Sequence, residues 1–330
     1  MKKKEKNVNT SGRKIRNIEE FEIETNALID YLSIQVDLNV KGVFSTFNDV
    51  TVCQTFNGGD CLQEVRSLSK FVLGMCIGVL HEIDSSSFPI EMEIWPYIKM
   101  HYNGKVLPAP STELKQAKVW HLLTQTIGFE KKELLFSHTV KDINPELYLD
   151  YLLKEPIIYE NGEKFCYSNA SAYLLSVVFQ QFLGMNLYDF AIDKLFNPLK
   201  IDSHEWGNYG SYCCGATGLK LHCKDIHKLG ILVLKNGVWN NRRIIHSEYL
   251  KDMTSAKVKI EDPTFVNKPL SPTHYGYFTF IDKEKNYFAN GARGKYIVVL
   301  PEKSLVLTVI ADTSATTLLQ NIIKNYIDRF

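Results

Sequence analysis

One segment of the chain, residues 67–83, constrains the fold more than any other. Its apolar residues recur on every side of a helix drawn through it: Leu68, Phe71, Val72, Leu73, Met75, Ile77, Val79 and Leu80. A surface helix keeps its apolar residues on one face, so a helix that is apolar all round must be buried all round. A chain of 330 residues can build a core large enough to surround it. We therefore predict that residues 67–83 form a central helix.

The two ends of the chain predict parts of one sheet. Residues 43–47 and 50–56 have the composition and the turn of a hairpin. Four further strands are predicted near the C-terminus, at residues 275–281, 286–289, 296–300 and 305–310. Their connections are short, which favours antiparallel pairing. Helical spacing at residues 18–32 and 318–327 predicts a first and a last helix that cover the same face of this sheet.

The middle of the chain, residues 85–190, predicts helices and no series of strands. Prolines separate its helical patterns, which are clearest at residues 114–126 and 170–183. Residues 219–235 are a further predicted helix. The predicted fold is therefore of the α+β class: a mainly antiparallel sheet, flanked by the N- and C-terminal helices, with an inserted helical lobe.

The same patterns predict how the chain is divided. Residues 17–84 and 191–330 form an α/β lobe and residues 85–190 form the helical lobe, so one unit is built from discontinuous segments. Residues 1–16 are polar and basic and predict a disordered tail. We expect the functional site in the seam between the two lobes.

The charge balance limits the possible partners. The formal net charge is +1 at pH 7, too small for a field that would attract nucleic acid or an anionic membrane. No apolar stretch of a signal peptide follows the basic residues 1–6, and the longest apolar run, residues 71–80, is too short to cross a bilayer. We therefore expect a cytoplasmic protein that acts on a small molecule, with no nucleic-acid or membrane partner.

The seven cysteines have neither a CxxC pair nor the spacing of a zinc site. His222, Cys223 and His227 lie close together in the sequence, but the apolar pattern around Ile226 favours an ordinary helix. We expect no metal and no cofactor.

A candidate nucleophile stands at the start of the predicted central helix. Ser67 and Lys70 are three residues apart, so on a helix that begins at Ser67 their side chains emerge on one face. An unionised lysine can take the proton of a serine hydroxyl, and burial lowers a lysine pKa toward the useful range. A structural interpretation stays open, in which Ser67 caps the helix and Lys70 extends from its first turn to water.

A second candidate site, Tyr167-Ser168-Asn169, precedes the predicted helix at residues 170–183. It would place a phenol beside the activated serine. The structural interpretation here is that Ser168 or Asn169 caps this helix, which Gly184 ends. Neither structural interpretation accounts for both sites in this order.

Ser67-Leu68-Ser69-Lys70 followed by Tyr167-Ser168-Asn169 resembles the motifs of the serine β-lactamase and penicillin-binding-protein superfamily. The similarity is greatest to the branch of class C β-lactamases, D-amino-acid peptidases and related esterases. Further segments of that branch have counterparts at residues 121–128, 218–230, 275–277 and 291–301. The resemblance covers roughly residues 40–312. It implies a β-lactamase-like fold.

The resemblance also implies a role for each residue. Ser67 would be the nucleophile that forms the acyl-enzyme, and Lys70 would accept its proton. Tyr167 would be a phenolic base that carries protons to the leaving group and from water. Asn169 would orient the substrate or Lys70. The backbone N–H groups of Ser67 and Ala292 would form the oxyanion hole.

The third motif departs from the family pattern of Lys-Thr-Gly or His-x-Gly, because this chain has Ala289-Asn290-Gly291 there. No cation precedes Gly291, and in penicillin-recognising enzymes that cation helps to bind the substrate carboxylate. Arg293 is a candidate substitute, although a surface arginine is the commoner situation. We therefore include Asn290, Gly291, Ala292 and Arg293 in the predicted substrate and oxyanion site.

The leading hypothesis for the function is a serine hydrolase that forms an acyl-enzyme on Ser67 and cleaves an ester or amide of a small molecule. One alternative is a β-lactamase or D-alanyl peptidase, which would take a lactam or a cell-wall peptide. Two others are an acyltransferase and a non-catalytic ligand-binding protein of the same fold.

Overall fold

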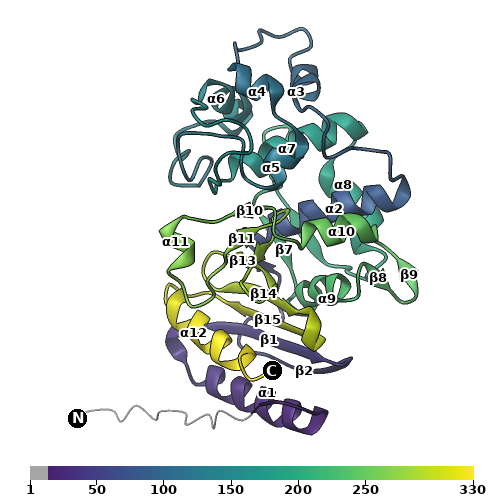
Figure 1. Cartoon of the computed structure of the whole chain (residues 1–330), viewed down its shortest axis with the longest axis vertical. Helices are drawn as coiled ribbons and strands as arrows, with labels where there is room; N and C mark the ends of the chain where they lie inside the picture. Colours follow the sequence, from purple (N-terminus) through teal and green to yellow (C-terminus); the bar gives the residue numbers. More distant parts are fainter. Residues whose placement is uncertain (1–13) are drawn as a thin grey trace, which may run out of the picture.

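The computed structural model describes residues 14–330 (Figure 1). Most of the predicted disordered tail, residues 1–13, lies outside the described residues. Ile15 does not fit that prediction, because its side chain is buried and its N–H donates to the carbonyl of Arg329 at 2.7 Å. The polar composition of the tail concealed one apolar residue that the C-terminal end of the chain covers.

The core of the molecule is an eight-stranded antiparallel sheet in the order β10-β11-β12-β13-β14-β15-β1-β2. Its strands are β1 (Val40–Phe47), β2 (Val50–Thr55), β10 (Val258–Lys259), β11 (His274–Tyr275), β12 (Phe280–Ile281), β13 (Tyr287–Gly291), β14 (Lys295–Leu300) and β15 (Leu305–Ala311). Strand β1 pairs with β15, so strands from the two ends of the chain are neighbours in the sheet, with only β2 beyond β1. The predicted antiparallel sheet and its N-terminal hairpin are confirmed.

The first and last helices, α1 (Ile18–Ser33) and α12 (Thr316–Ile327), lie side by side on one face of the sheet (Figure 1). The Thr25 hydroxyl of α1 and the Tyr326 hydroxyl of α12 are 2.6 Å apart, and Ser45 of β1 is 3.0 Å from the same phenol. This three-way contact ties both helices to the sheet and confirms that they share a face.

The opposite face of the sheet is covered by α2 (Leu68–Ile83) and α9 (Cys223–Leu234), and α10 (Ser247–Met253) packs on α2. Helix α9 packs closely on β14 and β15, because a Cβ added at Gly230 would lie only 2.7 Å from Val306 and 2.8 Å from Ile297. Every residue of α2 from Leu68 to Leu80 is buried, including a serine and a lysine. The predicted central helix is confirmed.

The helices that follow α2 in the sequence and precede residue 192 gather at one end of the molecule (Figure 1). They are α3 (Trp95–His101), α4 (Thr112–Gln116), α5 (Val119–Leu123), α6 (Tyr148–Lys154), α7 (Ala170–Leu183) and α8 (Leu187–Ala191), with a π-helical turn at Ile192–Phe196. Helix α7 packs against α3 and α5 and ends where Gly184 adopts φ = 66°, as the sequence predicts.

Shorter elements complete the described residues. They are β3 (Gln63–Glu64), β4 (His204–Trp206), β5 (Asn208–Tyr209), β6 (Tyr212–Cys213), β7 (Leu219–Leu221), β8 (Val238–Trp239), β9 (Arg242–Arg243), α11 (Pro263–Val266) and 3-10 turns at Val36–Leu38, Pro145–Leu147 and Pro301–Lys303. Strands β3, β7 and β4 form a small sheet that leads the chain to the start of α2. No helix in residues 14–330 combines the length and the apolar character needed to cross a bilayer.

Two predicted helices are shorter in the structure, and in both cases contacts distant in the sequence override the local pattern. The predicted helix at residues 114–126 is broken at Ala117. The backbone of Ala117 is extended, and its carbonyl accepts the N–H of Ile94 at 3.0 Å. The predicted helix at 219–235 begins only at Cys223, because the preceding residues form β7 between β3 and β4.

The strand predicted at residues 275–281 is also interrupted. The chain turns between β11 and β12, where Phe278 adopts φ = 53° and donates its N–H to the carbonyl of Leu123 at 3.0 Å. An alternating apolar pattern does not reveal such a turn, because the residues on both sides of it are equally buried.

Candidate active site

Ser67 is the N-cap residue of α2, and it is half-buried. The residue before it, Arg66, has φ = 53°, a left-handed conformation that costs a side-chain-bearing residue about 1 kcal/mol or more. On the other side of this turn the N–H of Val65 donates to the carbonyl of Leu219 at 2.8 Å. A strained turn between β3 and α2 therefore presents Ser67.

Neither candidate motif caps its helix with a side chain. Ser67 and Asn169 occupy the N-cap positions of α2 and α7, but neither side chain accepts a hydrogen bond from the first turn. The hydroxyl of Ser168 is buried and has no hydrogen-bond partner within residues 14–330. The structural interpretation of both motifs as caps does not agree with this geometry.

Lys70 lies at the centre of the site. Its Nζ is 3.1 Å from the Ser67 hydroxyl, 2.7 Å from Oδ1 of Asn169 and 3.2 Å from the carbonyl oxygen of Ala216. All three partners are uncharged, and Lys70 is only 1% exposed. Burial lowers the pKa of Lys70 to about 7. A large fraction of this lysine is thus unionised at neutral pH and able to accept a proton from Ser67.

Tyr167 approaches the same hydroxyl from the side of α7. Its ring centroid is 5.0 Å from the Lys70 Nζ. Burial raises the pKa of the Tyr167 phenol to about 12, although a hydrogen bond from the Ser67 side chain opposes this shift. The phenol is therefore neutral at physiological pH, and it can pass a proton between the Ser67 oxygen and a neighbouring group.

Gln125 holds the segment that carries Tyr167. The N–H of Ser168 donates to Oε1 of Gln125 at 3.1 Å, and Nε2 of Gln125 donates to the carbonyl of Ser168 at 3.2 Å. The backbone carbonyl of Gln125 also accepts the N–H of Cys166 at 2.9 Å. Gln125 lies in the family-like segment at residues 121–128, but nothing in the sequence indicates this contact with Ser168.

Asn169 is oriented by a loop that the sequence analysis did not single out. Its Nδ2 donates to the carbonyl of Leu135 at 2.9 Å, so its Oδ1 is directed to Lys70. Its backbone N–H donates to the carbonyl of Leu134 at 2.9 Å. Leu135 is fully buried with φ = 59°, an uncommon conformation for leucine. Because the acceptors are backbone carbonyls, no side-chain signal in the sequence could have identified them.

Gly291, at the end of β13, lies against the turn that presents Ser67. A Cβ at this position would be 2.3 Å from the carbonyl of Val65 and 3.1 Å from the Cβ of Arg66, so a side chain does not fit. Ala292 follows directly. Within the described residues, the backbone N–H groups of Ser67 and Ala292 have no hydrogen-bond partner. Both donors of the predicted oxyanion hole are thus available.

The structure does not bring the side chains of Asn290 and Arg293 to Lys70. Asn290 pairs with Tyr296, whose hydroxyl accepts a hydrogen bond from Gln320 of α12, so Asn290 faces the opposite side of the sheet from Gly291. Arg293 is half-exposed, and its guanidinium pairs with the carboxylate of Asp312. Alternation along β13 and this ion pair explain why neither joins the cluster.

Lys295 is a buried cation that the sequence analysis missed. It pairs directly with Gly291 across β13 and β14, and its side chain is 5% exposed. Its Nζ is 3.6 Å from the Asp312 carboxylate and 3.4 Å from the carbonyl of Arg293. Burial lowers the pKa of Lys295, while the Asp312 carboxylate opposes the shift. The available signal in the sequence was a lysine at the start of an apolar strand.

His227, which lies close to Cys223 in the sequence, has the surroundings of a structural histidine. His227 is buried in α9 between two hydroxyls, with Nε2 2.7 Å from Thr46 and Nδ1 2.9 Å from Thr308. Burial lowers its pKa to about 3, so it is neutral. No group of three His, Cys, Asp or Glu side chains within residues 14–330 is arranged to hold a metal ion.

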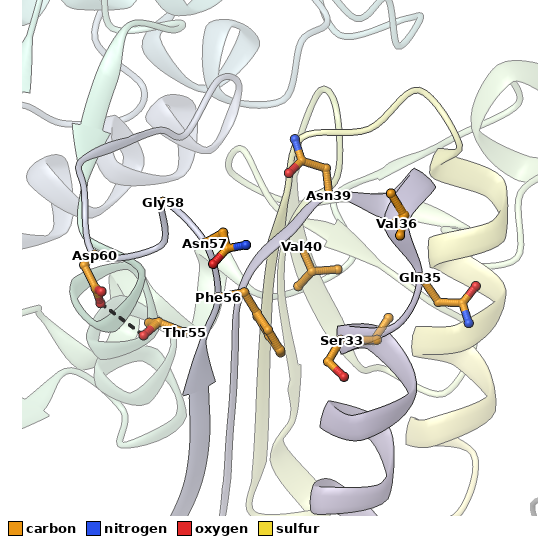
Figure 2. A pocket seen from close by; sticks show the side chains of 11 residues that line it. Ser33, Gln35, Val36, Asn39, Val40, Thr55, Phe56, Asn57, Gly58 and Asp60 are labelled. Atoms are coloured by element: carbon orange, nitrogen blue, oxygen red, sulfur yellow. Dashed lines mark hydrogen bonds between the residues drawn. The ribbon is translucent and has the colours of Figure 1, made fainter.

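A cavity of about 630 Å³ lies elsewhere in the molecule, between the end of α1, the start of β1 and the end of β2 (Figure 2). Figure 2 shows Asn39, Asn57 and Asp60 around its rim. None of its lining residues belongs to the cluster around Lys70. The cavity is therefore separate from the candidate active site.

A match to a known family over most of the chain identifies the family. The model of the Beta-lactamase family matches residues 57–321. The chain belongs to the beta-lactamase family. Proteins of this family are serine hydrolases that act on small-molecule amide or lactam substrates. The resemblance seen in the sequence and the predicted fold are both confirmed.

Solved structures support the same fold. A protein from Bacillus anthracis assigned as a 6-aminohexanoate-dimer hydrolase is 18% identical, with 92% of this chain and 80% of that chain covered and a TM-score of 0.71. An octameric penicillin-binding protein homologue from Pyrococcus abyssi is 15% identical (92% and 76% covered, TM-score 0.71). A class C β-lactamase from Rhodobacter sphaeroides is 14% identical (92% and 98% covered, TM-score 0.68). At these identities the likeness shows the fold alone. No curated protein matches the sequence.

Proposed function

We propose that this protein is a serine hydrolase that forms an acyl-enzyme on Ser67 and cleaves an ester or amide of a small molecule. The observation that carries the proposal is the environment of Lys70: a fully buried amine with three uncharged partners, one of them the Ser67 hydroxyl at 3.1 Å. Desolvation without a neighbouring carboxylate is the condition under which a lysine becomes a base near neutral pH.

The proposed reaction begins with proton transfer from Ser67 to Lys70 while Oγ attacks the substrate carbonyl carbon. The new bond to Oγ converts the carbonyl oxygen to an oxyanion, which the N–H groups of Ser67 and Ala292 stabilise. Collapse of this intermediate breaks the ester or amide bond, and the proton passes through Tyr167 to the leaving group. Water then attacks the acyl carbon, loses its proton by the same route, and releases the acid and free Ser67.

The third motif supports an ester or amide over a β-lactam. At Ala289, where the family pattern has a cation, the side chain is a buried methyl group on β13. Arg293, the candidate substitute, is engaged by Asp312. A substrate carboxylate therefore lacks the cation that the family pattern places two residues before Gly291, and Lys295, which pairs with Gly291 across the strands, is 3.6 Å from the Asp312 carboxylate. If the proposal is correct, concentrated enzyme leaves a chromogenic cephalosporin intact, and rapid turnover of that compound would favour the β-lactamase alternative.

The test of the proposal measures covalent labelling and turnover together. Purified protein is incubated with a fluorophosphonate probe and, separately, with p-nitrophenyl acetate, and intact mass and nitrophenol release are recorded. We expect one added label on the wild type and no label or turnover in Ser67→Ala. Ser85→Ala is the matched control, because Ser85 is exposed just beyond the other end of α2. Full turnover in Ser67→Ala would refute the proposal, and no reaction in any variant would favour the ligand-binding alternative.

A further inference from the structure

The connection between β10 and β11 is much longer than the sheet requires. These strands pair as neighbours in an antiparallel sheet, for which two to five connecting residues are enough, yet residues 260–273 lie between them and contain α11. The segment is ordered: the N–H of Ile260 donates to the carbonyl of Thr273 at 2.9 Å, and the side chains of Ile260 and Leu270 are buried. Residues 260–273 are therefore an ordered insertion between β10 and β11, and we refer to them as the α11 excursion.

The α11 excursion places an aromatic ring against the candidate catalytic tyrosine. The ring centroid of Phe265 is 5.3 Å from that of Tyr167, 5.9 Å from Phe165 and 5.3 Å from Phe280. Phe165 and Phe280 are buried, whereas Tyr167 and Phe265 are only partly buried. Phe265 and Tyr167 are therefore neighbouring rings that both keep some accessible surface.

An ion pair fixes the α11 excursion to the loop below the Tyr167 segment. The carboxylate of Asp262 is 2.7 Å from the Nζ of Lys132. Although burial acts in the opposite direction, hydrogen bonds from Lys132 and Thr264 hold the pKa of Asp262 below its usual value. Lys132 comes directly before Glu133, whose N–H donates to the carbonyl of Tyr167 at 3.4 Å. The position of α11 is therefore coupled to the position of Tyr167.

The chemistry of this side of the site is apolar. The rings around Tyr167 come from Phe165, Phe265, Tyr275 and Phe280, and none of them carries a charge at neutral pH. The charged side chains Arg293 and Lys295, which follow Gly291 in the sequence, both face the carboxylate of Asp312 instead. A substrate group that lies beside Phe265 would lose water without gaining an ionic partner, so an uncharged apolar group is favoured there.

We propose that Phe265 forms an aromatic wall of the substrate site and that the enzyme selects substrates with an apolar aliphatic or aromatic group next to Tyr167. This inference rests on the proposed function, because it takes Ser67 and Tyr167 as the reaction centre. Phe265 contacts the substrate in this arrangement and determines specificity. The Asp262–Lys132 pair acts indirectly, by holding the wall in place.

The test compares p-nitrophenyl acetate with p-nitrophenyl octanoate, which differ only in the apolar length of the acyl group. We expect the wild type to prefer the octanoate ester in kcat/KM. Phe265→Ala should lower kcat/KM for octanoate about tenfold, and for acetate by a smaller factor, since a lost apolar contact in a pocket changes discrimination by about that amount. The loss should fall mainly on KM, because an apolar contact binds the substrate and the transition state alike.

Phe182→Ala is the matched control for this substitution. Phe182 is also a partly buried phenylalanine with aromatic neighbours, Phe88 and Tyr97. It lies near the far end of α7, about 18 Å along the helix from the end that follows Asn169. We expect this variant to keep the ratio of octanoate to acetate turnover. Phe265→Leu preserves apolar packing if the alanine variant does not fold, and it should reduce the octanoate preference by a smaller factor.

A second pair of variants tests the ion pair. Lys132→Met removes the contact with Asp262, and Lys131→Met removes a comparable surface pair with Glu155 that does not involve the α11 excursion. We expect Lys132→Met to reduce the octanoate preference about threefold, the scale of a weak ion pair, while Lys131→Met leaves the ratio unchanged.

Labelling by the fluorophosphonate separates the two possible failures. If Ser67 is labelled but Phe265→Ala changes both esters by the same factor, or the wild type prefers acetate, the aromatic wall is refuted and the proposed hydrolase survives. If the wild type is neither labelled nor active, the proposed function itself fails. A selective loss of octanoate turnover with labelling intact supports both.

Discussion

Two buried lysines of this protein, Lys70 in α2 and Lys295 in β14, differ in one respect that decides what each can do. Both side chains are almost fully buried, and burial lowers the pKa of both. The Nζ of Lys70 contacts only uncharged oxygens, whereas that of Lys295 is 3.6 Å from the carboxylate of Asp312. The comparison shows that burial alone does not make a base, because a neighbouring carboxylate stabilises the charged form again.

The largest expected effect comes from removing Lys70, the lysine whose partners are all uncharged. Lys70→Met should lower kcat/KM for p-nitrophenyl acetate about a thousandfold, because Ser67 loses its proton acceptor. Lys295→Met is the matched control, an equally buried lysine exchanged for the same apolar chain, and it should retain turnover within tenfold of the wild type. Steady-state kinetics measure both. Equal losses in the two variants would mean that the uncharged partners of Lys70 do not set it apart from Lys295.

The pH dependence of the wild type should report Lys70 directly. With a pKa of about 7, the unionised fraction of Lys70 falls tenfold for each pH unit below 7. We expect kcat/KM to be lost on the acid side with an apparent pKa near 7, and to be about a hundredfold lower at pH 5 than on its plateau. Tyr167, with a pKa of about 12, stays neutral throughout this range. A flat profile between pH 5 and 8 would contradict the role of Lys70.

Lys70 should also lower the stability of the fold. Its pKa is about 7 in the folded protein and near 10.4 in the unfolded chain, so between these values the unfolded state binds more protons and stability rises with pH. The loss of stability that Lys70 causes reaches its full size below pH 7. Lys70→Met should therefore raise the free energy of unfolding at pH 7 by about 2 kcal/mol, after the loss of its hydrogen bonds, and by less as the pH approaches 10.4. Urea unfolding at pH 7 and 9.5 measures this difference, and a destabilised variant at pH 7 would oppose the argument.

A carboxylate placed beside Lys70 should make it resemble Lys295. Asn169→Asp keeps the shape of the side chain and puts a negative charge 2.7 Å from the Nζ. An opposite charge this close raises a lysine pKa by about one unit or more, so kcat/KM at pH 7 should fall about fivefold or more and the acid limb should move to higher pH. The pH–rate profile distinguishes this shift from a loss at all pH values, which would mean that Asn169 acts on the substrate instead.

The sequence predicted those elements whose pattern is local. The all-round apolar character of residues 67–83 predicts the buried α2, and Gly184 predicts the end of α7. The predicted helices at residues 114–126 and 219–235 are wrong in extent, because Ala117 pairs with Ile94 and Leu219–Leu221 pairs with two other strands. Helical periodicity does not register such partners, which come from elsewhere in the chain.

The candidate site was also only partly predictable from the sequence. Residue type and spacing identified Ser67 and Lys70, since three residues on one helix bring two side chains to one face. Asn290 and Arg293 were included for their position in the sequence, and the structure turns the first to the other face of the sheet and pairs the second with Asp312. The orientation of a strand and the partner of a charge depend on which neighbours the fold supplies.

By itself the sequence determined which chemical groups are present, their order, and the helix that holds Ser67 and Lys70 together. Only the tertiary structure decided that Lys70 has uncharged partners, that Asn169 reaches it from 99 residues away, and that Phe265 lies next to Tyr167. The physical reason is that desolvation, pKa and ring packing are set by all the atoms within a few ångströms of a side chain, and in a folded chain most of those atoms belong to residues remote in the sequence.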